Sequence, residues 1–220
     1  MHPVLRLYED VLSSAENVEF RLPPLPRFIF VAHGTATIDG KVVAEGEACQ
    51  GEGATLVKPG AAGVTCWRWE LARGDQPSTT ANAPGMVTHE KFTAYLETLP
   101  KGDLLMRGDS VAFPAGGCAY LHRHQGPGIR CLLEGGLRVD THGRSTSYGP
   151  GGAWYESGTD AVFAQAAADK PSRFIRVMIL PRALLGKSSI QYVNEDDKAK
   201  PKLQSYKIYA DAPIAFGGKK

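Results

Sequence analysis

The sequence predicts an all-β protein that is built from two similar modules of short strands. The 220 residues contain 25 glycines and 15 prolines without being low in complexity, which indicates many turns between short strands. Half-buried strands are indicated where apolar and polar residues alternate, as they do at 64–71. The segments 30–39 and 131–140 also resemble each other, which indicates an internal repeat.

Composition excludes several classes of protein. Hydrophobic residues make up 43% of the chain, which is enough for a core, and no apolar run approaches the length of a membrane span. A net charge of +2 argues against nucleic acid or an anionic membrane as a partner. The N-terminus carries early acidic residues and lacks the apolar core of a signal peptide. The four cysteines are widely spaced, so we expect free thiols and a cytoplasmic protein.

The first half of the chain begins with an arm or edge segment at 1–26, which ends in a proline-rich stretch that no central strand would contain. Asp39-Gly40 is the strongest short-range signal for a hairpin in this half. We expect strands at 28–32, 35–38, 41–43, 54–57 and 64–71.

The middle of the chain separates the two modules. Residues 74–85 are polar and rich in turn formers, so they are the best candidate for a linker. Residues 87–99 fit a helix, capped by Thr88, with Phe92 among the residues that line one face. The alternative is an extended segment that forms the first strand of the second module.

The second half repeats the β pattern. Besides the segment around residues 122–124, strands are expected at 111–113, 129–133, 138–140, 146–148, 153–156, 161–165 and 174–180. After Pro181 the chain becomes polar and then alternates again at 205–214, where we expect it to cover the sheet edge of the first barrel or of a partner subunit. The predicted division is therefore 1–84, 85–184 and a C-terminal extension at 185–220.

His122 and His124 are the most informative pair of residues. Side chains at i and i+2 of a strand point to the same face, so the two imidazoles can converge on one point. Neutral imidazole is the commonest protein ligand of transition metals. The alternative is a hydrogen-bonded polar pair at the mouth of a barrel. Only the second module has such a pair, so we expect only its interior to be polar.

The stretch 120–143, with its His-x-His pair, glycine-proline turn and tight Glu134-Gly135-Gly136, resembles the first motif of the cupin family. The resemblance implies two cupin-type jelly-roll barrels in tandem, a bicupin. In metal-binding cupins a Glu follows the two histidines, and a second motif supplies a third His. Here Gly128 stands at the Glu position, and Val162 or Phe163 stands near the His position, so both motifs are degenerate.

Glu156 is the best candidate for a third ligand, because its strand should cross the same barrel. Two His and one carboxylate suit Fe(II), with Zn, Mn and Ni as competitors. The alternative is a solvent-facing carboxylate at a strand end. Cys118 is either a further ligand or a buried inert thiol.

Four residues are candidates for a substrate pocket. Gln125 offers a substrate hydrogen bond or is a turn residue, and the aromatic residues either floor a pocket or belong to the core. The candidates are Gln125, Trp154, Tyr155 and Phe163.

The cupin resemblance leads to three hypotheses for function. The first is a metal-dependent enzyme of the dioxygenase, isomerase or lyase type that acts on a small organic molecule. The second is a non-catalytic binder of small molecules, and the third is a structural protein. No catalytic triad, phosphate loop or dinucleotide fingerprint is present in the sequence. We expect a homodimer, because cupins commonly pair through their sheets.

Overall fold

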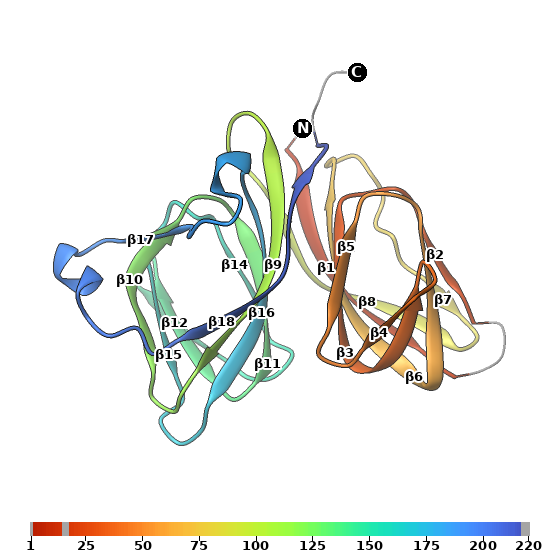
Figure 1. Cartoon of the computed structure of the whole chain (residues 1–220), viewed down its shortest axis with the longest axis horizontal. Coiled ribbons are helices and arrows are strands. Elements are labelled where there is room, and N and C mark those ends of the chain that lie inside the picture. Colours follow the sequence, from red (N-terminus) through yellow and green to blue (C-terminus); the bar gives the residue numbers. More distant parts are fainter. Residues whose placement is uncertain (1, 15–17, 217–220) are drawn as a thin grey trace. The chain divides into compact units, whose positions relative to one another are not determined.

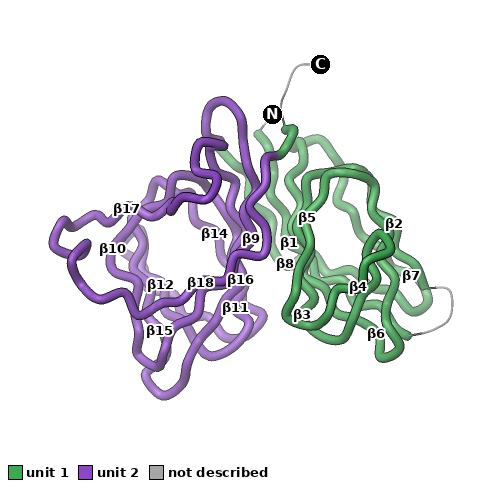
Figure 2. Tube along the Cα trace, in the orientation of Figure 1, with its two compact units in different colours: residues 1–97, 214–220 green, residues 98–213 purple. Residues whose placement is uncertain are grey.

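The computed structural model describes residues 2–14 and 18–216, and nearly all of its regular structure is antiparallel β-strand (Figure 1). The chain divides into two compact units, residues 1–97 with 214–220 and residues 98–213 (Figure 2). Each unit is a barrel of antiparallel strands, so the predicted all-β class with two barrels is confirmed. The described residues include no helix with the length and hydropathy that a bilayer span requires.

The first unit is one eight-stranded sheet that curls around an apolar core. Its order is β4-β3-β6-β1-β8-β7, with β2 paired to β6 and β5 paired to β3. The long strands bend at bulges, one of them beside Gly34. Gly34 has a φ of 79°, and a Cβ there would lie 2.4 Å from the Gly63 carbonyl oxygen, so glycine is required at this crossing. The strands are β1 (Val4–Leu12), β2 (Phe20–Leu22), β3 (Arg27–Ile38), β4 (Lys41–Ala44), β5 (Ala48–Gly51), β6 (Thr55–Ala72), β7 (Asn82–Ala83) and β8 (Met86–Tyr95).

The second unit consists of two five-stranded sheets. Their orders are β13-β12-β15-β10-β17 and β14-β11-β16-β9-β18. The strands are β9 (Leu104–Phe113), β10 (Cys118–His124), β11 (Gly128–Glu134), β12 (Leu137–Thr141), β13 (Arg144–Tyr148), β14 (Ala153–Glu156), β15 (Val162–Ala166), β16 (Ser172–Pro181), β17 (Ile190–Tyr192) and β18 (Ser205–Ile214). Inward residues of both sheets form an apolar core that includes Phe113, Leu132, Trp154, Val162 and Phe174.

The two units share one pattern of strand pairing. In the first unit β1 and β2 pair with β6, and β3 pairs with β5. In the second unit β9 pairs with β16, β10 with β15, and β11 with β14. The similar segments 30–39 and 131–140 fall on β3 and on β11 with β12, which are corresponding places in this pattern.

The helix expected at 87–99 is wrong. Residues Met86–Tyr95 form β8, which pairs with β1 along nearly the whole length of both strands. Thr88 does not cap a helix, because its hydroxyl donates to Asp10 Oδ1 at 2.7 Å. The alternative prediction, an extended segment, is correct for the backbone conformation. Its assignment to the second module is wrong, because β8 belongs to the first unit. Pairing with the long β1 strand outweighs the local helical periodicity.

The compact units divide the chain after residue 97, whereas the sequence placed the boundary after residue 84. The expected linker at 74–85 is a loop, but it is anchored to the interior of the first unit. The Gln76 carbonyl accepts from Arg6 at 2.9 Å, and Ser78 bonds to the Tyr8 hydroxyl at 2.8 Å.

The C-terminal extension as far as Pro213 belongs to the second unit, and its end from Ile214 belongs to the first unit. Strand β17 pairs with β10, and β18 extends the sheet beyond β9. Arg107 on β9 anchors β18 through two contacts with Asp211, at 3.0 and 2.8 Å. The extension therefore covers a sheet edge as expected, although the edge is a different one.

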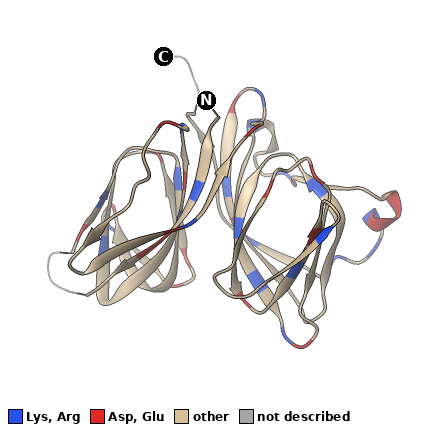
Figure 3. Cartoon of the chain, turned by 180° about the vertical axis from the view of Figure 1, so that it is seen from behind, with Lys and Arg blue, Asp and Glu red and all other residues tan. Residues whose placement is uncertain are grey.

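The interior of the first unit is also polar, which corrects the expectation that only the second would be. Arg68 is fully buried and contacts Asp10 at 2.6 Å and Glu70 at 2.9 Å. Arg27, also buried, lies 3.1 Å from Glu70. Elsewhere, basic and acidic residues are interspersed over the strands in the view of Figure 3.

Candidate metal centre

Strand β10 carries both histidines into the interior of the second unit. The burial of its last three residues alternates, with His122 and His124 buried and Arg123 exposed, as strand geometry requires. The two imidazole rings lie 4.9 Å apart at an interplanar angle of 80°. The rings are therefore brought together inside the barrel, with neither pointing to bulk solvent.

Hydrogen bonds fix how each imidazole presents its nitrogen atoms. His122 donates from Nδ1 to the Tyr120 carbonyl at 2.7 Å, which leaves the Nε2 lone pair available. The Nε2 atom of His124 lies 3.3 Å from Arg176 Nη1 and must accept there, because a guanidinium only donates. Its Nδ1 then donates to Ser189 Oγ, 3.3 Å away.

Glu156 extends from β14 into the same space. Its side chain is 9% exposed, so the alternative of a solvent-facing carboxylate is wrong. Trp154 donates from Nε1 to Glu156 Oε1 at 2.9 Å and orients the carboxylate. Each of His122, His124 and Glu156 offers one ligand atom, and these atoms all lie within 4.8 Å of one another. They form the one such group found among the described residues.

Gly128 explains why the carboxylate comes from β14. It stands where metal-binding cupins have their Glu, and a Cβ at this position would lie 2.3 Å from the Val177 carbonyl oxygen. No side chain fits there. Gly128 is the direct register partner of Glu156 on the neighbouring strand. The carboxylate therefore enters from the residue opposite the expected position.

Val162 is one of the two residues near the place of the expected third histidine, the other being Phe163. It is buried, and it is the register partner of His122 on β15. An isopropyl group offers no ligand atom, so the donor set consists of two imidazoles and one carboxylate. A triad of this composition leaves coordination positions open for water or substrate.

Two buried arginines complete the centre, and the sequence analysis did not select them. Arg176 forms a two-pronged ion pair with Asp109, at 2.9 and 2.7 Å. Arg130 Nη1 donates to the Gly128 carbonyl at 2.7 Å, and Nη2 lies 2.7 Å from Glu156 Oε2. Strand alternation could have found both arginines, because they share the inward face with Leu132 and Phe174.

The environment keeps both histidines neutral. Burial lowers the pKa of His122, although the nearby Glu156 carboxylate opposes this. Burial and then the charges of Arg176 and Arg130 hold the pKa of His124 well below its usual value. Burial also lowers the pKa of Arg130 to about 10, so its guanidinium remains charged at neutral pH. Neutral imidazoles are the form that binds metals.

A small cavity lies between these groups. Its volume is about 20 Å³, which is room for a single water or ion, and its walls include His122, His124, Arg130, Glu156 and Arg176. The short Arg130–Glu156 contact lacks hydrogen-bond geometry, so Arg130 Nη2 and Glu156 Oε2 are both buried without a hydrogen-bond partner. An unsatisfied carboxylate oxygen beside two neutral imidazoles fits a divalent cation.

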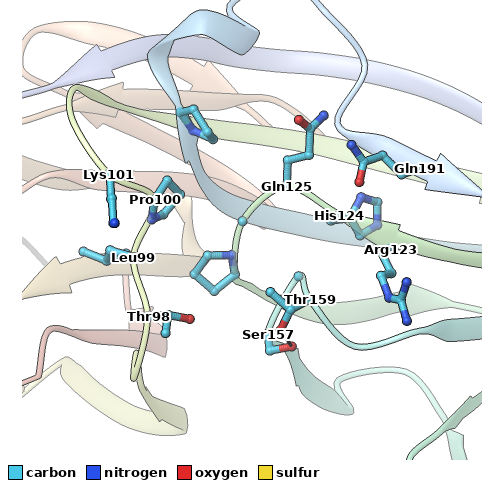
Figure 4. Close-up of a pocket in the computed structure, with 14 residues that line it drawn as sticks. Thr98, Leu99, Pro100, Lys101, Arg123, His124, Gln125, Ser157, Thr159 and Gln191 are labelled. Carbon is cyan, nitrogen blue, oxygen red and sulfur yellow. Dashed lines mark hydrogen bonds between the residues drawn. The ribbon is translucent and has the colours of Figure 1, made fainter.

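The other predicted residues lie in different places. Trp154 lines the small cavity. Gln125 does not; it lines another pocket of about 580 Å³, between Thr98–Lys101 on one side and Arg123 and Gln191 on the other (Figure 4). His124 lines both this pocket and the small cavity.

Tyr155 and Phe163 are not among the residues that line the cavity. In each strand the neighbouring residues point into the barrel. Because side chains alternate between the two faces of a strand, Tyr155 and Phe163 point to the outer face. Cys118 is a free, half-buried thiol and is not part of the ligand group.

Comparisons with known proteins identify the fold. No protein-family description matches the chain, and no curated sequence is similar to it. Among solved structures, the oxalate decarboxylase–formate complex of Lactobacillus farciminis matches with a TM-score of 0.59 and 11% identity, covering 91% of this chain and 82% of the other. AerE from Microcystis aeruginosa matches with a TM-score of 0.56 and 12% identity, covering 82% and 89%. The chain has the cupin fold.

A third cupin match is a point mutant of the oxalate decarboxylase of Bacillus subtilis, with a TM-score of 0.57 and 12% identity over 89% of this chain and 73% of the other. Identities this low show a shared fold and leave the activity open. The site must therefore be interpreted from the residues of this chain, above all the His122–His124–Glu156 group.

Proposed function

We propose that the second barrel is a metal-dependent enzyme centre that acts on a small organic molecule, with His122, His124 and Glu156 as the ligands. The observation that carries the proposal is the convergence of three buried ligand atoms within 4.8 Å. A bound divalent metal would polarise a substrate oxygen or activate dioxygen, which is the chemistry of dioxygenase, isomerase and lyase reactions. Solved structures with the same fold include decarboxylases and a salicylate 1,2-dioxygenase, which supports this broad class.

The residues around the ligands have the arrangement that metal sites use. The Tyr120 carbonyl and Ser189 hold the Nδ1 atoms of the two histidines, which directs both Nε2 atoms inward. Trp154 holds the Glu156 carboxylate in the same way. Phe113, Phe174 and Ala164 line the cavity and exclude water. These groups therefore preorganise the three side chains that would bind the metal.

Non-catalytic binding of a small molecule is the second candidate, and one observation favours it. The charges of Arg130, Arg176, Glu156 and Asp109 sum to zero, so the buried cluster is balanced without a cation. A binder needs no metal at this position, whereas the enzyme requires one. Metal content therefore separates the two candidates.

The decisive experiment is elemental analysis of protein purified without an affinity tag, compared with a His122→Ala/His124→Ala double variant. We expect about one equivalent of Fe, Zn, Mn or Ni in the parent protein and a loss of nearly all of it in the double variant. A His33→Ala/His142→Ala variant, whose imidazoles are exposed, is the matched control and should keep its metal. A parent that never retains metal, even after incubation with each ion, would favour the binder.

The assembly and the cellular location are part of the proposal. All four cysteines are free, which supports a reducing cytoplasm. Strand β18 is the last strand in the order of its sheet, which supports a homodimer formed by pairing of strands. A small-molecule ligand, and neither nucleic acid nor a membrane, is the partner that the interspersed charges of Figure 3 support.

A further inference from the structure

We propose that Arg130 is a carboxylate-binding residue whose availability depends on the metal: Glu156 holds it in the empty centre, and metal binding frees it for a small organic acid. The inference rests on the proposed metal site and adds a second ligand to it. It predicts that the metal and the acid each increase the affinity of the centre for the other.

The contacts of Arg130 are the starting point. The residue is 1% exposed, and its Nη1 is used by the Gly128 carbonyl. Its Nη2 lies 2.7 Å from Glu156 Oε2 without hydrogen-bond geometry and has no other hydrogen-bond partner. A buried donor that is left unsatisfied is costly, so this N–H favours any acceptor that reaches the cavity.

Metal binding removes the one charge that compensates Arg130. A divalent cation bound to Glu156 Oε2 would repel the guanidinium that lies 2.7 Å from the same oxygen, which weakens the hold of Glu156 on Arg130. Arg130 is buried and cannot turn out to solvent, so it then lacks an anion. An unpaired buried charge is strongly unfavourable.

A carboxylate is the group that restores the balance. It matches the fork geometry of a guanidinium, and its second oxygen can occupy an open position on the metal. The four buried charges sum to zero, so a divalent cation raises the total to two, and a carboxylate lowers it again. Arg176 keeps its two-pronged ion pair with Asp109, which is not a proposed metal ligand, so its charge stays compensated when a metal binds.

A surface pocket lies next to the cavity that Arg130 lines. A pocket of about 250 Å³ opens beside the centre and is lined partly by the C-terminal extension. His124, Arg176, Ile190 and Tyr206 line both this pocket and the small cavity, so these side chains form the partition between them. Tyr206 is 50% exposed, so the pocket is open to solvent.

The residues that line this pocket indicate the chemical character of the acid beyond its carboxylate group. Lys187 and Arg107 would attract an anion, and Ile190 and Ile208 offer apolar surface to a short carbon chain. The occupant is therefore a small carboxylate with an apolar body.

The first unit provides an internal comparison. Its buried Arg68 occupies the place in the pairing pattern that Arg176 has in the second unit, opposite Ile29 where Arg176 is opposite Arg130. Two carboxylates, Asp10 and Glu70, contact Arg68. The first unit thus has an isoleucine at the register position of Arg130, and its second buried arginine, Arg27, lies on the same strand two residues before Ile29 and contacts Glu70.

The test is calorimetric titration of metal-free protein with Mn²⁺ in sodium butyrate, in sodium phosphate and in sodium chloride with neutral butyramide, all at equal ionic strength. We expect Mn²⁺ to bind at least tenfold more tightly in butyrate than in the other two solutions. Butyrate affinity should rise by the same factor when Mn²⁺ is present.

The variants assign the effect to Arg130. In Arg130→Gln we expect less than a twofold difference between butyrate and chloride, with Mn²⁺ binding retained. Arg130→Lys keeps the positive charge but loses the two parallel N–H donors of the guanidinium, so the difference in Mn²⁺ affinity between butyrate and chloride should be intermediate. Arg138→Gln, which removes an exposed arginine that pairs with Asp140, is the control and should behave like the parent.

Each other outcome has one meaning. Equal Mn²⁺ affinity in all three solutions would overturn this inference and leave the metal site intact. A full butyrate effect in Arg130→Gln would exclude Arg130, and a larger effect of phosphate would exclude carboxylates as the preferred class. Absence of Mn²⁺ binding under every condition would overturn the proposed function itself.

Discussion

At the scale of single residues, the carboxylate of the centre stands on β14, and the neighbouring strand β11 has a glycine at the position where the cupin motif has its Glu. Gly128 leaves no room for a side chain, and Glu156 extends from the opposite register position. The sequence alone predicted both histidines from their spacing, but it did not predict how close Glu156 lies to them. That closeness depends on the pairing of strands that are far apart in sequence, which local periodicity does not encode.

Glu156→Gln tests this carboxylate. The fold should survive, because the amide has the shape of the carboxylate and Trp154 can still donate to its oxygen. Metal affinity should fall at least tenfold, about 1.4 kcal/mol, because a neutral oxygen attracts a divalent cation less strongly. Calorimetric titration with metal measures the change. Glu134→Gln, at an exposed ion pair with Arg173, should bind metal like the parent; equal binding by both variants would remove Glu156 from the ligand set.

Cys49 provides a pH-dependent test of packing in the first unit. Burial, and then the charge of Asp39, raises the pKa of its thiol to about 11. At pH 8 its thiolate fraction, and so its rate of alkylation, should be roughly two-hundredfold below that of an ordinary thiol of pKa about 8.5. The rate should rise about tenfold per pH unit up to pH 10, because each unit increases the thiolate fraction tenfold. Mass spectrometry of iodoacetamide-labelled peptides measures this, and rapid labelling at pH 8 would contradict the raised pKa and the partly buried position of the thiol.

At the scale of elements, pairing partners decide the conformation more than local sequence does. The strands with clear alternation or a hairpin signal were predictable, among them the strand beside Asp39-Gly40. The strand Met86–Tyr95 was not predictable, because its sequence has helical periodicity and only its pairing with the long strand β1 makes it extended. Strand β18 was predicted as a strand, but its partner β9 lies about a hundred residues earlier in the chain and had no local signal.

Asp211 tests how β18 is held. Asp211→Ala should destabilise the protein by about 3 kcal/mol, because it leaves the buried Arg107 guanidinium without its carboxylate. Chemical denaturation, followed by fluorescence, measures the change. The matched variant Asp103→Ala breaks an exposed pair with Arg182 and should cost less than about 0.5 kcal/mol. Equal effects would show that β18 is held by its backbone pairing alone.

At the scale of the whole molecule, two units with one pairing pattern have different interiors. Phe20 and Leu22, on β2, are apolar core residues, whereas His122 and His124 lie on β10, the strand with the same pairing in the second unit. The sequence predicted that the first module lacks a His pair at this place, but its prediction that only the second interior is polar was wrong. It did not predict the ion pairs inside the first unit, because Arg68 and Asp10 come from distant strands.

Hydrogen exchange tests the division of roles between the units. A ligand that binds only the folded state stabilises it by about 2.7 kcal/mol at one hundred times its dissociation constant. Saturating metal should therefore slow exchange in β10 and β14, which carry the ligands, and leave β2 and β5 unchanged. Mass spectrometry of peptides from both units makes the comparison in one sample. Protection confined to the first unit would place the metal elsewhere.

The central claim is that His122, His124 and Glu156 hold one metal ion inside the second barrel. A crystal structure of the metal-loaded protein, with anomalous data at the absorption edge of the metal, tests it most directly. We predict a single anomalous peak about 2.0 to 2.2 Å from both histidine Nε2 atoms and a Glu156 oxygen, with Arg130 released from Glu156. A peak outside this group, or an empty centre in protein that carries one equivalent of metal, would contradict the claim.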